Sequence, residues 1–134
     1  RAGKIRYIGF SAHTTLSDRD LRFLAAELVR EKLFRYLGAE IPYSLATETE
    51  TFDEEREGKL YIRVTIISER RAHKPIIIGE GGAMLKKIGQ AARLEIERLC
   101  GRPVFLDLWV KITPHWRRNE QQLRRLGLKP NISS

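Results

Sequence analysis

The run G-E-G-G at residues 79–82 limits how this chain can fold more than any other feature. Three isoleucines follow Pro75 directly before it, and residues 83–100 repeat apolar side chains at helical spacing directly after it. Glycine has no Cβ atom, so the backbone can turn sharply there and another part of the chain can come close. The sequence therefore predicts a short helix and a long helix joined by a tight glycine turn.

The residues before this turn predict one helix and two strands. Ser17 and Asp20 have the spacing of a capping box at a helix start, and Gly38 is the expected stop of that helix. Residues 43–51 and 60–67 then alternate apolar or β-branched side chains with others, which is the period of a strand. Because only a short acidic stretch separates these strands, we expect them to pair as an antiparallel hairpin.

The residues after the glycine turn complete the predicted fold. The long helix is expected to end at Gly101, a third strand to run from Val104 to Ile112, and residues 120–126 to add a short C-terminal helix. The resulting order is helix, strand, strand, helix, helix, strand. It predicts an α+β fold in which a three-stranded sheet packs on helices.

The chain has a net charge of +8, and the position of this charge along the chain is informative. Residues 1–67 contain eleven Lys or Arg and eleven Asp or Glu, whereas residues 68–134 contain fourteen and six, so the whole excess lies in the second half. A basic segment of this kind favours a polyanionic partner, of which nucleic acid is the commonest. A charge that serves only solubility is the alternative.

Several classes of function are disfavoured. No apolar run reaches the roughly 18 residues of a membrane span, and a single cysteine, Cys100, cannot make a disulfide framework, so we expect a cytoplasmic protein. His13, His73 and His115 are too scattered to predict a metal site, and we expect neither a metal nor a cofactor. We also expect no catalytic residues, because no set of nucleophile, base and orienting group emerges.

A glycine turn followed by a helix can hold a sugar-phosphate backbone. The first N–H groups of a helix have no partner within the helix, and they attract phosphate oxygens. The KH domain, a class of RNA-binding domain, uses a G-x-x-G turn in this way to clamp about four nucleotides. The G-x-x-G spacing is weak evidence by itself, and a tight turn between helices without any ligand is the alternative interpretation.

Longer stretches of the sequence resemble the C-terminal domain of the Era family of GTPases, which is a type II KH domain. The similar stretches are 22–27 (RFLAAE), 30–33 (REKL), 41–43 (IPY), 74–79 (KPIIIG), 85–89 (LKKIG), 108–111 (LWVK) and 126–127 (LG). The resemblance covers residues 16–128 and implies a type II KH fold that binds single-stranded RNA. It further implies the 3′ end of small-subunit ribosomal RNA as the target and a role in assembling the small ribosomal subunit.

The sequence lacks the motifs with which a GTPase binds its nucleotide. Neither the phosphate loop G-x-x-x-x-G-K-[ST] nor the base-reading motif N-K-x-D occurs in it. We therefore expect an RNA-binding domain that is not itself an enzyme. We also expect it to be a monomer. A protein-interaction module that docks on a GTPase domain or on a ribosomal protein is the alternative function.

The resemblance and the residues around the turn together give a set of candidate RNA contacts. We expect the turn to hold phosphates, basic side chains to supply charge, and apolar side chains to form a floor for bases. The turn residues are Gly79, Glu80, Gly81 and Gly82, the basic residues are Lys74, Lys86, Lys87 and Arg63, and the apolar residues are Ile76, Ile77, Ile78, Leu85 and Ile88. Because the family usually has a lysine or similar residue at the position of Glu80, we expect its carboxylate to repel phosphate and to reduce the affinity for RNA.

Three aromatic residues are candidates for stacking on unpaired bases. Trp109 lies among apolar residues of the third strand, and we expect it to pack in the core or against the sheet. Trp116 stands beside two arginines and is a better surface candidate, with anchoring of the C-terminal helix as its alternative role. Tyr61 shares a strand face with Arg63, and both stacking on a base and packing within the fold are consistent with its position.

The two ends of the chain fall outside the predicted domain. Residues 1–15 are interpreted as an N-terminal extension or a fusion remnant of unclear role, and residues 129–134 as a flexible tail. Residues 3–13 resemble a strand of the aldo-keto reductases. A whole barrel and a nicotinamide site do not fit in this length, so we assign this stretch no function.

Overall fold

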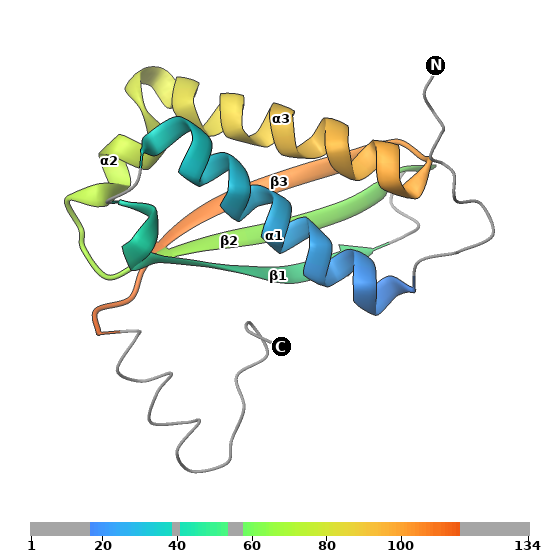
Figure 1. The fold of residues 1–134 in the computed structure, drawn as a ribbon, viewed down its shortest axis with the longest axis horizontal. Helices are drawn as coiled ribbons and strands as arrows, with labels where there is room; N and C mark the ends of the chain where they lie inside the picture. The colour runs from blue at the N-terminus through green and yellow to red at the C-terminus, as the bar shows by residue number, and fades with distance from the viewer. Residues whose placement is uncertain (1–16, 39–40, 54–57, 116–134) are drawn as a thin grey trace, which may run out of the picture.

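Two long helices lie side by side on one face of a three-stranded sheet (Figure 1). The computed structural model describes residues 17–38, 41–53 and 58–115 of the 134-residue chain. In chain order the elements are α1 (Asp18–Leu37), the 3-10 turn η1 (Pro42–Ser44), β1 (Leu45–Asp53), β2 (Leu60–Ser68), α2 (His73–Ile78), the 3-10 turn η3 (Glu80–Gly82), α3 (Ala83–Cys100) and β3 (Val104–Ile112). Among the described helices, none combines the length and the apolar character needed to cross a bilayer.

The predicted α+β class and the order of the described elements are confirmed. The first helix begins as predicted, because Ser17 Oγ accepts a hydrogen bond from the Asp20 N–H at 3.1 Å. It also ends as predicted, at Gly38, which has a φ of 86°. The predicted C-terminal helix at 120–126, the extension at 1–15 and the tail at 129–134 lie outside the described residues.

The start of the first strand was predicted wrongly. Tyr43 and Ser44 were expected in the strand but belong to the 3-10 turn η1, so β1 begins at Leu45. The backbone N–H of Ser44 donates to the carbonyl oxygen of Ile41 at 3.0 Å, and its hydroxyl donates to the same oxygen at 2.9 Å. Both bonds hold these residues in a turn, although the period of the side chains fits a strand.

The sheet is mixed, with the strand order β1-β2-β3. β1 and β2 form the predicted antiparallel pair, with an irregularity in the register between Thr49 and Thr51. β3 runs parallel to β2, and the chain crosses over between them through α2 and α3. Because of this crossover, the end of β3 lies beside the end of β2, where α2 begins, and the Thr113 N–H donates to the Ser68 carbonyl at 2.7 Å.

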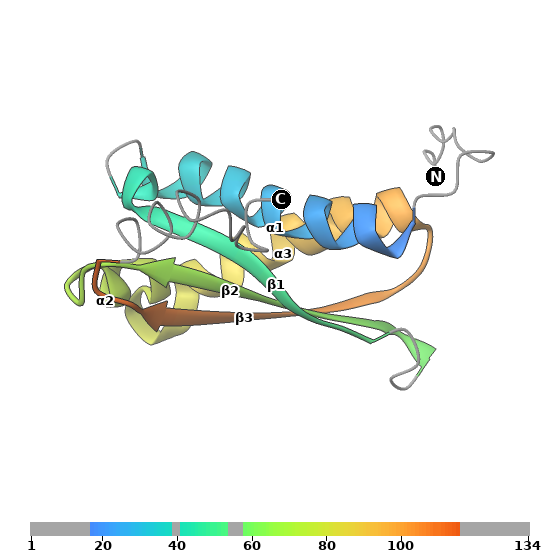
Figure 2. The same cartoon turned by 90° about the horizontal axis from the view of Figure 1, so that it is seen from below.

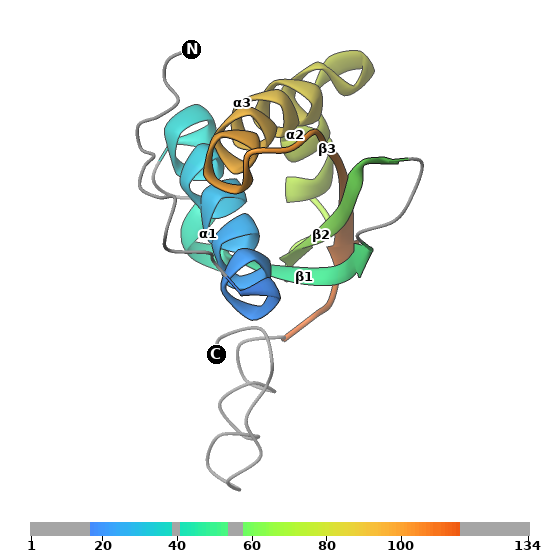
Figure 3. The same cartoon turned by 90° about the vertical axis from the view of Figure 1, so that its right-hand side faces the viewer.

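Within the residues that the structure describes, helices bury one face of the sheet. Both long helices lie on the same side of the strands (Figure 2), and no described helix covers the other side (Figure 3). Alternate residues of β2, from Leu60 to Ile66, are at most 1% exposed and pack against Val29 of α1 and Ile88 of α3 in one core. The intervening side chains of β2 and β3 therefore point to the uncovered side, called the open face below.

Arginines of α1 bind main-chain carbonyls of the edge strand β1. Arg22 donates to the Thr49 carbonyl at 3.1 Å, and Arg30 donates to the Leu45 carbonyl at 3.0 Å. The Thr49 hydroxyl donates in return to the Arg22 carbonyl at 2.6 Å. These bonds fix α1 along the edge of the sheet.

A buried lysine joins α1 to α3. The Lys32 side chain is only 2% exposed, and its Nζ lies 3.0 Å from carboxylate oxygens of both Glu31 and Glu95. Burial lowers the pKa of Lys32, but the hydrogen bonds to the two glutamates outweigh burial and leave this pKa raised. The lysine therefore remains charged at neutral pH while its aliphatic stem packs between the helices.

We expect the stem of Lys32 to contribute more to stability than its charge does. Lys32→Ala removes the buried stem and should lower the free energy of unfolding by about 2 kcal/mol. Lys32→Met keeps a similar stem without the charge and should cost less than about 1 kcal/mol, because both glutamates stay partly exposed to water. Urea denaturation of both variants measures their free energies of unfolding. Equal losses of stability in the two variants would contradict a larger contribution from the stem than from the charge.

The raised pKa of Lys32 also predicts a pH dependence. The lysine stabilises the folded state fully below its unfolded-state pKa of 10.5, and this contribution is lost as the pH rises through the higher folded-state pKa. The stability difference between the wild type and Lys32→Met should therefore shrink above pH 10.5. Denaturation of both proteins across this range measures it, and a constant difference would contradict the assigned pKa direction.

Candidate nucleic-acid interface

The glycine turn between α2 and α3 has a backbone conformation that L-residues rarely adopt. Gly79, Gly81 and Gly82 have φ values of 79°, 63° and 81°. The Gly79 N–H donates to the Pro75 carbonyl at 2.8 Å and ends α2, and the Gly82 N–H donates to the Gly79 carbonyl at 3.1 Å. The predicted tight glycine turn between two helices is confirmed.

The first glycine of the turn also allows a close approach between the two helices. A Cβ atom on Gly79 would lie 2.6 Å from the Cβ and 2.7 Å from the backbone nitrogen of Met84. At Gly81 and Gly82, in contrast, a Cβ would meet no atom within 4 Å. Gly79 therefore sets the packing of α2 on α3, while the two later glycines leave their backbone open to a ligand.

The start of α3 faces this open backbone. Gly82 is its N-cap residue and has a left-handed conformation, and no side chain caps the first N–H groups of the helix. Glu80 and Gly81 are exposed beside it. An uncapped helix start with an exposed turn can accept a phosphate group.

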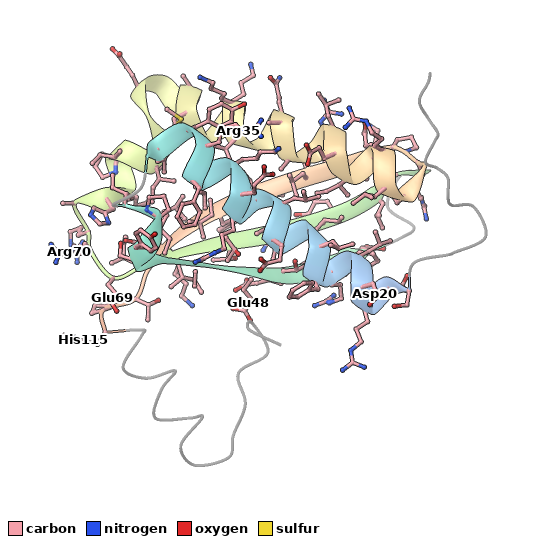
Figure 4. All side chains as sticks on the ribbon, viewed as in Figure 1. Asp20, Arg35, Glu48, Glu69, Arg70 and His115 are labelled. Carbon is pink, nitrogen blue, oxygen red and sulfur yellow. The ribbon has the colours of Figure 1, made fainter. Side chains whose placement is uncertain are left out.

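The predicted basic residues are only partly brought together at this turn. Lys74 on α2 and Lys86 in the first turn of α3 are exposed. Lys87 reaches toward α1, where its Nζ lies 4.6 Å from the centre of the Tyr36 ring. Arg70, in the connector before α2, adds an exposed charge at this end of the molecule (Figure 4).

The predicted apolar floor divides into core and surface. Ile77 and Ile88 are 0% exposed and belong to the hydrophobic core, so they offer no surface to a base. Ile76 is 48% exposed, and Ile78 and Leu85 are partly exposed. The side chains that a ligand can reach near the turn are therefore those of Ile76, Ile78 and Leu85.

Arg63 does not lie at the glycine turn. It belongs to the open face, where its Cζ lies 4.4 Å from the centre of the Trp109 ring and its Nε lies 3.5 Å from Asp107 Oδ2. Trp109 is 52% exposed, so of its two expected positions the core is wrong, and the ring lies against Arg63 and Asp107 on the sheet. In β3 the residues on either side of Trp109 face the helices, and strand alternation places Trp109 on the other side.

Asp107 was not predicted as a site residue, although it organises this part of the open face. Its Oδ2 accepts hydrogen bonds from the Tyr61 hydroxyl at 2.7 Å and from Trp109 Nε1 at 2.9 Å. The two-residue spacing of Phe105, Asp107 and Trp109 was a signal that they share one side of β3. The sequence did not reveal that the described helices all lie on the other side of the sheet.

Burial shifts the pKa of two further titratable groups in the described part of the chain. Burial raises the pKa of the Cys100 thiol, which favours its protonated form at neutral pH. Burial and the neighbouring Glu50 raise the pKa of Glu48, which lies on β1 away from the glycine turn. Within residues 17–38, 41–53 and 58–115, no group of three or more His, Cys, Asp or Glu is placed to hold a metal ion.

A family model of the KH domain matches residues 40–117, which include the glycine turn and all three strands. The chain belongs to the KH domain family. The predicted KH fold is thereby confirmed, and the matched residues contain the G-x-x-G turn between α2 and α3.

The predicted resemblance of this KH domain to the Era family is also confirmed. GTPase Era of Ruminiclostridium cellulolyticum is 45% identical over 122 residues, which are 91% of this chain and 41% of the relative. GTPase Era of Geobacter metallireducens is 50% identical over 113 residues, which are 84% and 38% of the two proteins. The chain thus spans about two fifths of the length of these relatives.

Solved structures of Era share the fold of this KH domain. A variant of Aquifex aeolicus Era bound to GDP·AlF4⁻ has a TM-score of 0.73 and 44% sequence identity, over 82% of this chain and 37% of that protein. Era in complex with MgGDPNP and nucleotides 1506–1542 of 16S ribosomal RNA matches with the same score, identity and coverage.

The close contact at Gly79 predicts that alanine lowers the stability more at position 79 than at position 81 of the KH turn. Gly79→Ala combines an unfavourable φ with a clash against Met84, so it should lower the free energy of unfolding by about 3 kcal/mol. Gly81→Ala has an unfavourable φ but no clash, and it should cost about 1 kcal/mol. Thermal melting of both variants tests the order, and an equal or reversed order would contradict the packing role of Gly79.

Proposed function

We propose that this KH domain binds single-stranded RNA through the glycine turn, and that its target is the 3′ end of small-subunit ribosomal RNA. The observation that carries this proposal is the complex of Era with nucleotides 1506–1542 of 16S ribosomal RNA. The Era in that complex is 44% identical to this chain, and the match covers 82% of this chain. The open backbone at Gly81 and Gly82 and the uncapped start of α3 support the same site.

In the proposed mode the turn positions the RNA and the neighbouring side chains read it. The backbone of residues 79–82 holds phosphates, and Lys74 and Lys86 add exposed charge on either side of the turn. Ile76, Ile78 and Leu85 present the exposed apolar surface on which bases lie. Ile77 and Ile88 act indirectly, because they anchor α2 and α3 in the core.

The proposed biological role is that of the RNA-binding part in assembly of the small ribosomal subunit. The relatives are GTPases, and this chain spans about two fifths of their length. Because the sequence contains no G-x-x-x-x-G-K-[ST] phosphate loop, we assign it the binding function and not GTP hydrolysis. In this role it acts as a monomer in the cytoplasm.

A pair of matched variants tests the turn as the phosphate site. Glu80→Asp with Gly81→Asp places two carboxylates at the turn, whereas Glu80→Asn with Gly81→Asn has nearly the same shape and no charge. Residue 81 has open space around it, and Asp and Asn tolerate its left-handed backbone comparably. We expect the aspartate pair to bind a ribosomal 3′-end oligomer about tenfold more weakly than the asparagine pair.

Fluorescence anisotropy at low and physiological salt measures both variants. Binding to RNA should weaken by about 0.7 log unit per phosphate contact for each tenfold rise in salt. Equal affinities of the two variants would rule out the turn as the site. If the wild type binds no RNA, the protein-interaction function becomes the better proposal.

The carboxylate of Glu80 gives a further prediction about affinity. Glu80→Lys should bind the same oligomer more tightly and should steepen the salt dependence by about 0.7 log unit, because it adds one phosphate contact. Glu80→Gln, the control, should tighten binding less and leave the salt slope unchanged. An unchanged affinity in Glu80→Lys would place residue 80 away from the phosphates.

A further inference from the structure

The open face of the sheet carries two exposed aromatic rings that the glycine turn does not use. Trp109 is 52% exposed and Phe105 is 51% exposed. Because Leu106, Leu108 and Val110 of β3 pack against the core, strand alternation places both rings on the open face. The two long helices lie on the other side of the strands (Figure 2). They are the large hydrophobic side chains exposed on this face within the described residues. Exposed aromatic rings on a sheet are the surface with which several single-strand RNA-binding domains stack on bases.

Both rings are held in place by neighbours. Trp109 Nε1 donates to Asp107 at 2.9 Å, and Arg63 lies against the ring at 4.4 Å from its centre. Phe105 stacks on Tyr61, with ring centres 5.4 Å apart and an angle of 16° between the planes. A ring that is fixed before binding loses little conformational entropy when a base stacks on it.

Basic and acidic side chains both lie on this part of the open face. The carboxylate of Asp107 is close to the guanidinium of Arg63, at 3.5 Å, and accepts two hydrogen bonds, so it is not a free negative charge facing the solvent. Lys111 follows Trp109 by two residues on the same side of β3 and is exposed. The nearby acidic groups of β1 are Glu48, Glu50 and Asp53. Asp53 is the register partner of Tyr61, and Lys111 counters the charge of Glu48.

β3 connects this face with the glycine turn. Its Leu108 side chain lies against Gly89 of α3, where a Cβ would be 3.4 Å from Leu108 Cδ1. The next residue along β3, Trp109, points to the opposite side of the sheet. Because β3 is an edge strand, RNA that runs from the turn along α3 can pass over this edge and reach the open face.

We propose that the open face is a second stacking surface for unpaired bases of the same RNA strand, with Trp109 and Phe105 as the stacking residues. This inference rests on the proposed RNA-binding function of the glycine turn. It assigns Arg63 to the orientation of Trp109, together with Asp107, and not to the turn. The RNA footprint is then longer than the about four nucleotides that a KH turn holds.

The length of the RNA separates the two surfaces. An oligomer of about five nucleotides engages the turn alone, and one of about twelve reaches the open face. We expect Trp109→Ala and Phe105→Ala each to weaken binding of the longer oligomer by about 5- to 100-fold and to leave the shorter one unchanged. Trp109→Phe keeps a stacking ring without the bond to Asp107, and it should retain most of the affinity for the longer oligomer.

Phe23→Ala is the matched control, because Phe23 is 47% exposed on α1, away from both surfaces. It should change neither affinity, and circular dichroism melting should report folded protein for every variant. The inference is overturned if the wild type binds both oligomers equally tightly. It is also overturned if Trp109→Ala lowers only the melting temperature, or weakens both oligomers equally.

A different result is expected if the glycine turn does not bind RNA. In that case the short oligomer binds equally to the two turn variants, the aspartate pair and the asparagine pair, whatever the open-face variants do. Both proposals are supported if two results are obtained together. The aspartate pair must lose affinity for the short oligomer, and Trp109→Ala must lose affinity for the longer oligomer alone.

Discussion

Burial of a single face of the sheet determines where the other elements of this domain lie. Alternate side chains of β2 are almost completely buried under α1 and α3, so α2 and α3 have to pack on the same side as α1. The chain must then reverse between α2 and α3 within a few residues. Gly79 makes this possible, because only a residue without a Cβ leaves room for Met84. The tight reversal at Gly79 is thus tied to the packing of the core, whereas Gly81 and Gly82 lie outside this contact.

Most of the fold could be predicted because its boundaries depend on local chemistry. Ser17 marks a helix start because its side chain accepts a hydrogen bond, and Gly38 and Gly101 mark helix ends because both have a positive φ. The start of β1 was missed because two hydrogen bonds of Ser44 to one carbonyl oxygen outweigh the period of its neighbours. The parallel direction of β3 follows from the crossover through α2 and α3, which is a property of the whole chain.

Less of the candidate site could be predicted, because exposure depends on contacts between distant segments. Three consecutive isoleucines in a six-residue helix have no period that tells which one faces the core, and the structure buries Ile77 while Ile76 stays 48% exposed. Alternation along β3 groups Phe105 with Trp109, but it does not tell which side the helices cover. For the same reason Arg63 was assigned to the turn, although it contacts Trp109 and Asp107.

The arginines that bind β1 have a consequence for how this domain behaves at high concentration. An edge strand offers main-chain groups with which a second molecule can pair, and such pairing extends a sheet into aggregates. In β1 the carbonyls of Thr49 and Leu45 already accept hydrogen bonds from Arg22 and Arg30. An incoming strand would have to displace two charged donors and detach them from α1. The helix that helps to build the core therefore also protects this side of the sheet from intermolecular growth.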